Sequence, residues 1–107
     1  MNSKRKGNAG ERELCALLAA DGVAVRNEQW GKGGKDNPDI SLEMAGKRYH
    51  VECKRAERFN AYDAMEQAVR DANGHAIPVV MHRRNRKQWL VVMNLEHFID
   101  LAKNRKE

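Results

Sequence analysis

The sequence lacks the features that mark membrane, secreted and disordered proteins. No apolar run approaches the length that crosses a bilayer, and the basic residues 1–7 lead into no apolar signal-peptide core. There is no internal repeat and no low-complexity stretch, and 41% hydrophobic against 33% charged residues is typical of a globular chain. We therefore expect an intracellular protein with no membrane partner.

Cysteine is scarce, with Cys15 and Cys53 as the only two in the chain. Both lie among apolar residues, in segments that we expect to be a helix and a strand. An intracellular setting keeps thiols reduced, so we expect no disulfide. Two cysteines without a nearby pair of histidines also make a poor zinc site.

Basic residues are plentiful, and they give the chain a formal net charge of +5 and a pI near 9.5. Any single basic cluster is explained equally well by a solvated surface. Three clusters in one chain of 107 residues favour a polyanionic partner such as nucleic acid. The clustered residues are Lys4, Arg5, Lys6, Lys32, Lys35, Arg83, Arg84, Arg86 and Lys87.

Hydrophobic periodicity and turn residues predict one α/β domain over residues 1–107, with residues 1–7 as a flexible basic arm. A central mixed β-sheet would be flanked by helices, in the order α-β-β-β-α-β-β-α. The expected helices are 9–20, 61–73 and 95–103, and the expected strands are 23–28, 39–44, 47–54, 77–81 and 89–93.

Some of these expectations concern single residues near the start of the chain. Leu14 and Leu17 recur at helical spacing, which predicts that both face the core. Val23 and Val25 alternate with less apolar neighbours, which predicts that they form the inner face of a strand. Gly22 is expected to cap the end of the first helix.

The strand pair 39–44 and 47–54 carries the most information about function. Successive side chains of a strand point to opposite faces, so the pair has an apolar face and a polar face that includes Asp39, His50, Glu52 and Lys54. A hairpin with one solvated face explains this alternation by itself, and His50 is then a solvated strand histidine. Antiparallel pairing would nevertheless bring Asp39, at the start of one strand, beside Glu52 at the end of the other.

Two carboxylates and an ammonium in one patch suit metal-assisted hydrolysis of a phosphodiester. Mg²⁺ prefers oxygen ligands and keeps several waters. It can polarise the phosphodiester and lower the pKa of a water molecule, and Lys54 beside it could stabilise the transition state. The backbone carbonyl of Cys53, between Glu52 and Lys54, is a further candidate ligand.

The sequence also resembles a known family. Its Pro38-Asp39, followed by Glu52-Cys53-Lys54, resembles the PD-(D/E)xK nuclease signature. The resemblance extends over roughly residues 4–95 to the Holliday-junction resolvases of archaea and phages within that superfamily. It is carried there by Lys6-Gly7, Gly10-Glu11-Arg12-Glu13-Leu14, Leu17-Leu18, Gly22, Arg26, Tyr62, Gln67, Pro78 and Trp89. Arg26 is a basic residue of this stretch and is added to the candidate DNA contacts.

The resemblance implies a restriction-endonuclease-like fold and a role for each residue of the site. Asp39 and Glu52 would ligate Mg²⁺ or Mn²⁺ directly, and Glu11 would reach the metal directly or through water. Lys54 would be the catalytic lysine. Gln67 lies where many superfamily members carry a glutamine near that lysine, although an exposed helix position explains it equally well.

The resemblance further implies an enzyme that cuts branched DNA in the cytoplasm of a bacterial or phage-infected cell. Resolution of a junction needs two symmetric cuts, so we expect a homodimer. Two alternatives stay open: a structure-specific or nicking nuclease of the VRR-Nuc type, and a basic DNA-binding module that does not cut. A complete set of acids and lysine favours the enzyme. Trp30, in the glycine-rich loop, could stack on a base or anchor the loop.

Overall fold

The computed structural model describes residues 3–27 and 37–103, and of residues 3–7 only the backbone. Several predicted positions therefore lie outside the described part of the chain. These are the residues Trp30, Lys32 and Lys35 and the side chains of Lys4, Arg5 and Lys6.

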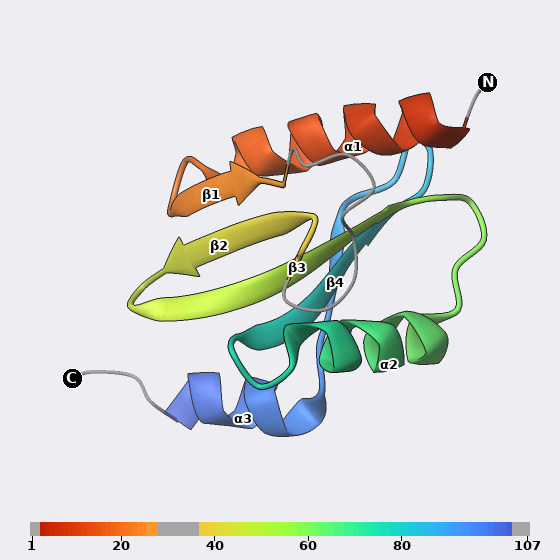
Figure 1. Cartoon of the computed structure of the whole chain (residues 1–107). Helices are drawn as coiled ribbons and strands as arrows, with labels where there is room; N and C mark the ends of the chain where they lie inside the picture. The colour runs from red at the N-terminus through yellow and green to blue at the C-terminus, as the bar shows by residue number, and fades with distance from the viewer. Residues whose placement is uncertain (1–2, 28–36, 104–107) are drawn as a thin grey trace.

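A five-stranded sheet forms the centre of the molecule (Figure 1). Its strands lie in sequence order: β1 (Val23–Arg26), β2 (Ile40–Met44), β3 (Lys47–Arg55), β4 (Ile77–Arg83) and β5 (Leu90–Val92). Neighbouring strands are antiparallel except β3 and β4, which are parallel and are connected through helix α2 (Ala61–Ala72). Helix α1 (Ser3–Leu18) precedes the sheet and α3 (Leu95–Lys103) follows it. The predicted element order and the mixed α/β class are confirmed.

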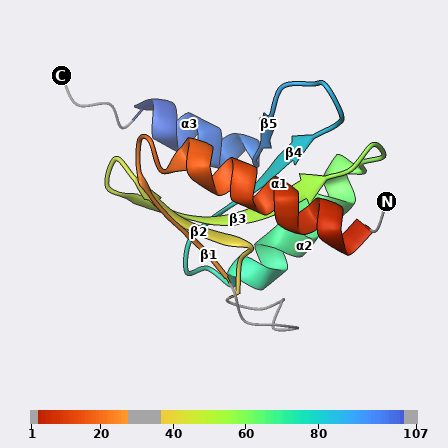
Figure 2. The same cartoon turned by 90° about the horizontal axis from the view of Figure 1, so that it is seen from above.

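Helices α1 and α2 cover opposite faces of the sheet (Figures 1 and 2). The core under α1 consists of Leu14, Ile40, Leu42, Val51, Val79 and Met81. The smaller core under α2 consists of Ala64, Met65, Ala68 and Val80. The parallel pair β3 and β4 is therefore buried on both of its faces, as parallel strands generally are.

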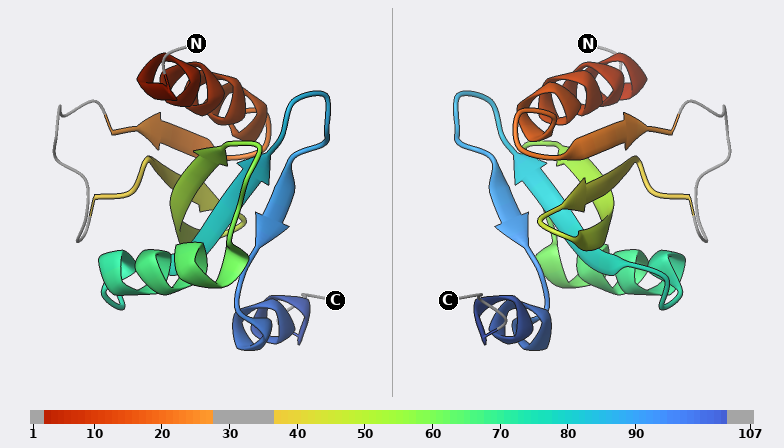
Figure 3. Two further views of the ribbon diagram at one scale, coloured as in Figure 1. Left: turned by 90° about the vertical axis from the view of Figure 1, so that its right-hand side faces the viewer. Right: turned by 90° about the vertical axis from the view of Figure 1, so that its left-hand side faces the viewer.

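Helix α3 lies beyond β5, at one side of the sheet (Figure 3). None of its residues is buried. Its apolar side chains Leu95, Phe98 and Ile99 are 70%, 58% and 43% exposed. The helix forms as predicted, but none of the residues that the structure describes buries its apolar stripe.

The start of the chain differs from the prediction in one respect. Helix α1 begins at Ser3, so residues 3–7 form its first turns and are not a flexible arm. Lysine and arginine have high helix propensity, which lets the helix extend upstream of the apolar periodicity. The basic residues at positions 4–6 are thereby carried on a helix.

The expected inner faces of α1 and β1 are also partly wrong. Leu17 is 56% exposed, and Val23 and Val25 are 63% and 59% exposed, whereas Ala24 packs against the core under α1. β1 is the edge strand of the sheet and lies beside α1. Val23 and Val25 therefore alternate with Ala24 as predicted, but the two valines lie on the exposed face of β1 and not on its inner face.

Gly22 has a different role from the predicted helix cap. Helix α1 ends at Leu18, and a Cβ atom at Gly22 would lie 2.6 Å from the carbonyl oxygen of Glu43 on β2. Such a contact is too short for a real side chain, so glycine permits the close approach of the chain to β2.

Candidate active site

The hairpin of β2 and β3 fixes the register on which the site depends. Its loop is Ala45–Gly46, with φ of 52° and 78°, as a type I′ turn requires. The pairing runs from Met44 opposite Lys47 to Ile40 opposite Val51. Asp39 precedes Ile40 and Glu52 follows Val51, so the same register, continued by one residue, sets Asp39 beside Glu52, whose charge acts on it. The sequence predicted this juxtaposition from strand alternation alone.

Asp39 is anchored to both neighbouring strands. Its carboxylate Oδ2 accepts a hydrogen bond from the backbone N–H of Cys53 at 2.8 Å. Its own carbonyl oxygen accepts a hydrogen bond from the N–H of Asn27 at 3.0 Å, just after β1. The carboxylate therefore has a fixed position at the end of the strand pair.

The surroundings of Asp39 raise its pKa from 3.8 to about 7. Burial is the largest cause, followed by the negative charge of Glu52, and the hydrogen bond from Cys53 opposes both. The charge of Glu11 and a side-chain hydrogen bond with Glu52 raise the pKa further. Asp39 therefore lies beside Glu52 and within reach of the charge of Glu11, and a cation placed there would relieve the repulsion.

Glu52 is itself almost fully buried, with 8% of its surface exposed. Its Oε2 atom lies 2.7 Å from Nε2 of His50, which is 3% exposed. The interpretation of His50 as a solvated strand histidine is therefore wrong. α2 covers this face of β3, so the polar face of the hairpin is an interior face at His50 and Glu52.

Glu11 approaches the site from α1. Its Oε1 atom lies 3.2 Å from Nη2 of Arg26 on β1, and both side chains are one-fifth exposed. The helix lies very close to the sheet here, since a Cβ atom at Gly10 would be 2.7 Å from Cβ of Arg55. The absence of a side chain at Gly10 lets α1 bring Glu11 within range of Asp39. Arg26, predicted as a DNA contact, is paired with Glu11.

Lys54 and Cys53 follow Glu52 on β3. Lys54 is half-buried and shares the face of Glu52, and its charge acts on the Cys53 thiol. Burial and the neighbouring acids raise the pKa of that thiol to about 12, so it stays protonated at neutral pH. The part of Cys53 that contacts the site is its backbone N–H, which donates a hydrogen bond to the carboxylate of Asp39.

Gln67 lies on α2 and is exposed. The buried face of this helix is formed by Ala64, Met65, Ala68 and Ala72. The structure thus brings together Glu11, Asp39 and Glu52, with Lys54 two residues further along β3, and leaves Gln67 on the outer side of the helix. The role of Gln67 remains a prediction.

The arginine run, which consists of Arg83, Arg84, Arg86 and Lys87, lies at the same end of the parallel strands as Lys54. β3 and β4 are parallel, with Arg55 opposite Arg83, so both strands end there. Arg55 Nη2 donates to Asn85 Oδ1 at 2.8 Å, and the N–H of Asn85 donates to Glu57 Oε2 at 2.7 Å. These bonds tie the β4–β5 turn to the segment that follows Lys54. Sequence reasoning could not give this proximity, because it depends on the parallel register.

Members of the arginine run differ in their surroundings. Arg83 donates from Nη1 to Glu13 Oε2 and from Nε to the Lys87 carbonyl, both at 2.6 Å, so it connects the turn to α1. Arg84, Arg86 and Lys87 are exposed. The side chains of these three residues, unlike that of Arg83, are open to solvent on the turn.

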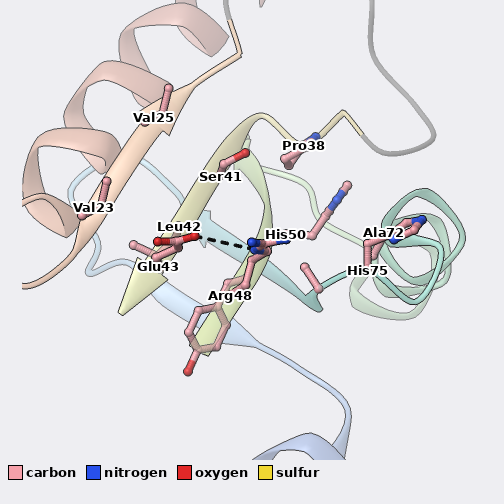
Figure 4. A pocket seen from close by; sticks show the side chains of 12 residues that line it. Val23, Val25, Pro38, Ser41, Leu42, Glu43, Arg48, His50, Ala72 and His75 are labelled. Carbon is pink, nitrogen blue, oxygen red and sulfur yellow. Dashed lines mark ion pairs between the residues drawn. The ribbon is translucent and has the colours of Figure 1, made fainter. Parts of the chain in front are cut away.

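An open hollow of about 660 Å³ lies next to the site, on the α2 face of the sheet (Figure 4). It is lined by His50 together with Val25, Ser41 and His75, among others. The Arg48–Glu43 ion pair, at 3.7 Å, belongs to its lining. Asp39, Glu52 and Lys54 do not line it. His50 lines the hollow and also contacts Glu52, so it connects the hollow with that carboxylate.

The donors present fit a hard divalent cation. No three His, Cys, Asp or Glu side chains in the described part of the chain form a ready-made metal cage. The arrangement instead offers Asp39 and Glu52, with the charge of Glu11 nearby. Mg²⁺ is commonly bound in this way, by one or two carboxylates with water in the remaining positions.

Comparisons with known proteins bear on the fold and the family of the chain. No curated protein matches the chain. Among solved structures, the chain is similar to Hjc of Archaeoglobus fulgidus, a Holliday junction resolvase from an archaeal hyperthermophile, with 27% identity and a TM-score of 0.62. The match covers 78% of this chain and 72% of that chain. The restriction-endonuclease-like fold is thereby confirmed. Within the described residues, no helix is long and apolar enough to span a membrane.

A family model described as "Phage putative PDDEXK endonuclease" matches residues 2–107. The expected resemblance to PD-(D/E)xK nucleases and to resolvases is therefore confirmed. Since the match spans almost the whole sequence, the chain belongs to this family of phage PDDEXK nucleases.

Proposed function

We propose that this protein is a divalent-metal-dependent endonuclease that cuts branched DNA, with the Holliday junction as its main substrate, and that it acts as a homodimer. The observation that carries the proposal is Asp39 opposite Glu52, with burial and the neighbouring acids raising the pKa of Asp39 to about 7. The similarity to an archaeal Holliday junction resolvase supports the choice of substrate.

Asp39 and Glu52 would hold Mg²⁺ or Mn²⁺, with Glu11 acting directly or through water. When bound, the ion supplies neutralisation of the phosphate charge and a lower pKa for the attacking water. Hydrolysis adds water across one P–O bond, so negative charge grows on the phosphate and on the leaving oxygen. Lys54 lies on the face of Glu52 and would stabilise that charge. The backbone carbonyl of Cys53 is a further proposed ligand.

DNA would be bound along the edge where β3 and β4 end. The exposed Arg84, Arg86 and Lys87 lie on the turn that is tied to the segment after Lys54. These residues would contact phosphates on one flank of the cut, since phosphate contacts fix the position of a protein on DNA. Residues 4–6 and the pair Lys32 and Lys35 are proposed as further contacts.

The homodimer would form through the apolar surface of α3 and β5. Leu95 and Phe98 on α3 and Leu90 and Val91 on β5 are each more than half exposed. Large apolar side chains that are exposed on neighbouring elements are often found at an interface. A second copy is the expected occupant, because two symmetric cuts need two active sites related by a two-fold axis.

The deciding experiment is cleavage of a labelled panel with Mg²⁺: four-way junction, flap, linear duplex and single strand. We expect preferential cutting of the junction, with no activity in EDTA or in Asp39→Asn and Glu52→Gln. Preference for another structure would favour the VRR-Nuc type. Binding without cutting in any condition would leave only the DNA-binding module.

The dimer is tested separately by analytical ultracentrifugation. We expect the wild type to sediment as a dimer and Phe98→Glu as a monomer, because a charge would have to be buried in the interface. The exposed and apolar Leu17, on α1, gives the matched control Leu17→Glu, which should remain dimeric. A monomeric wild type with and without DNA would contradict the homodimer and leave the nuclease proposal standing.

A further inference from the structure

His50 is the most buried of the four histidines, with 3% of its surface exposed. His82 is similarly buried, at 6%. The two differ in what they contact. His82 Nε2 lies 2.8 Å from the carbonyl oxygen of Ala56, and its ring stacks on Phe59. His50 is directed to a carboxylate of the acidic site.

The contact between His50 and Glu52 follows from strand geometry. Residues two apart on a strand share a face, and both side chains are buried on the face of the sheet that carries α2. Nε2 of His50 is 2.7 Å from Oε2 of Glu52. With the carboxylate oxygen of Glu52 as acceptor, Nε2 of His50 is the donor, and 2.7 Å is at the short end of the range for such a hydrogen bond.

This hydrogen bond restricts a side chain that otherwise has several rotamers. Glu52 has Asp39 on one side and His50 on the other. Beyond His50 lies the open hollow of about 660 Å³ (Figure 4). If the imidazole were removed, the carboxylate of Glu52 could turn away from Asp39 toward that hollow and its water.

We propose that His50 is a positioning residue that holds the carboxylate of Glu52 toward Asp39, so that the two can bind one divalent cation together. The inference rests on the proposed metal-dependent activity. Hydrogen-bond partners of metal ligands commonly set metal affinity, and their loss typically weakens it by about 10- to 100-fold.

The test is calorimetric titration of the metal-free protein with Mn²⁺, which measures affinity without DNA or turnover. His50→Ala should weaken binding by about 10- to 100-fold. His50→Gln should restore most of it, because the Gln amide nitrogen can occupy the place of Nε2. His50→Asn should not, because its shorter amide corresponds to Nδ1.

The matched control is His82→Ala, which removes a histidine of similar burial from the same face of the sheet but with a backbone partner. Its Mn²⁺ affinity should equal that of the wild type. Circular dichroism shows which variants are folded. If His50→Ala is not folded, the Mn²⁺ affinities of His50→Gln and His50→Asn test the inference instead.

Three results would overturn the inference. They are a folded His50→Ala with wild-type affinity, equal losses in His50→Ala and His82→Ala, and equal affinities of the Gln and Asn variants. A wild type that binds no Mn²⁺ would contradict the proposed function itself, which keeps the two failures distinguishable.

Discussion

The two faces of the β2–β3 hairpin are buried to a similar depth but with different chemistry. Toward α1, Ile40, Leu42 and Val51 are at most 2% exposed and wholly apolar. Toward α2, His50 and Glu52 are 3% and 8% exposed and bonded to each other. Burial of polar groups is costly even when they are paired. The comparison indicates that the α1 face serves stability, whereas the α2 face retains buried polar groups, which are the ones that we propose take part in the reaction.

The largest expected effect is on the α2 face. Lys54→Ala should lower the rate of junction cleavage by about 10²- to 10³-fold, because one charge that stabilises the transition state is lost. Binding of DNA should change little. Single-turnover cleavage and a binding titration in Ca²⁺ measure the two effects.

Lys47→Ala, at the opposite end of β3, is the matched control for loss of a positive charge from this strand. If Lys54→Ala instead lost affinity in proportion to rate, Lys54 would be a phosphate anchor. The difference between the apolar face and the polar face would remain, but the proposed role of Lys54 in the transition state would be wrong.

On the α1 face, Leu42→Ala should reduce the free energy of unfolding by about 2–5 kcal/mol, because it removes a buried side chain and leaves a cavity. Mn²⁺ affinity at a temperature where the variant is folded should not change. Ser41→Ala, exposed on the other face of the same strand, should alter stability by less than about 0.5 kcal/mol. Urea unfolding measures both. A large loss of metal affinity in Leu42→Ala would contradict the separate roles of the two faces of the hairpin.

The raised pKa of Asp39 predicts a pH dependence of the metal-free protein. The folded state keeps its proton up to about pH 7, whereas the unfolded chain loses it near 3.8. Between these values the folded state binds more protons, so the contribution of Asp39 to stability falls as pH rises. Asp39→Asn should remove this slope and should be more stable than the wild type at pH 8.

Thermal melts from pH 4 to 8 in EDTA measure this slope. Cleavage should have the opposite trend, since metal must displace the proton, and it should be lost as pH falls through about 7. More Mg²⁺ should move that loss to lower pH. A wild type and an Asp39→Asn variant with parallel stability profiles would show that the carboxylates repel less than the structure indicates.

The smallest expected effect is at the hairpin turn, which belongs to neither face. Ala45 has a φ of 52°, in the left-handed region that alanine disfavours. Ala45→Asn should stabilise the protein by up to about 1 kcal/mol, because asparagine followed by glycine suits a type I′ turn. Activity should be unchanged. A measured loss of stability would mean that Ala45 has contacts beyond the turn.

Strand alternation and turn residues predicted much of this structure. The register that places Asp39 opposite Glu52 follows from the Ala45–Gly46 turn and the length of the strands. The residue types of His50 and Glu52 did not reveal that α2 covers them, because burial of a polar face depends on tertiary packing. The same limit explains the misassigned faces of Val23 and Val25.

The proximity of segments distant in sequence could not be predicted in the same way. Arg83 and Glu13 are 70 residues apart, yet they form an ion pair. Their contact depends on the parallel pairing of β3 with β4, which the hydrophobic pattern does not specify. The assignment of metal and DNA contacts to particular residues remains a prediction.

Gly10 shows how one missing methyl group can determine the reach of Glu11, whose charge acts on Asp39. A side chain at this position would have to share space with Cβ of Arg55, 2.7 Å away, and Arg55 cannot yield there because that atom is fixed to its strand. Helix α1 would have to lift from the sheet, and Glu11 would lift with it. The amino acid at position 10 therefore affects where the next residue, Glu11, is placed. In a redesign of this fold, a larger residue at position 10 would move Glu11 away from Asp39 without a substitution of either acid.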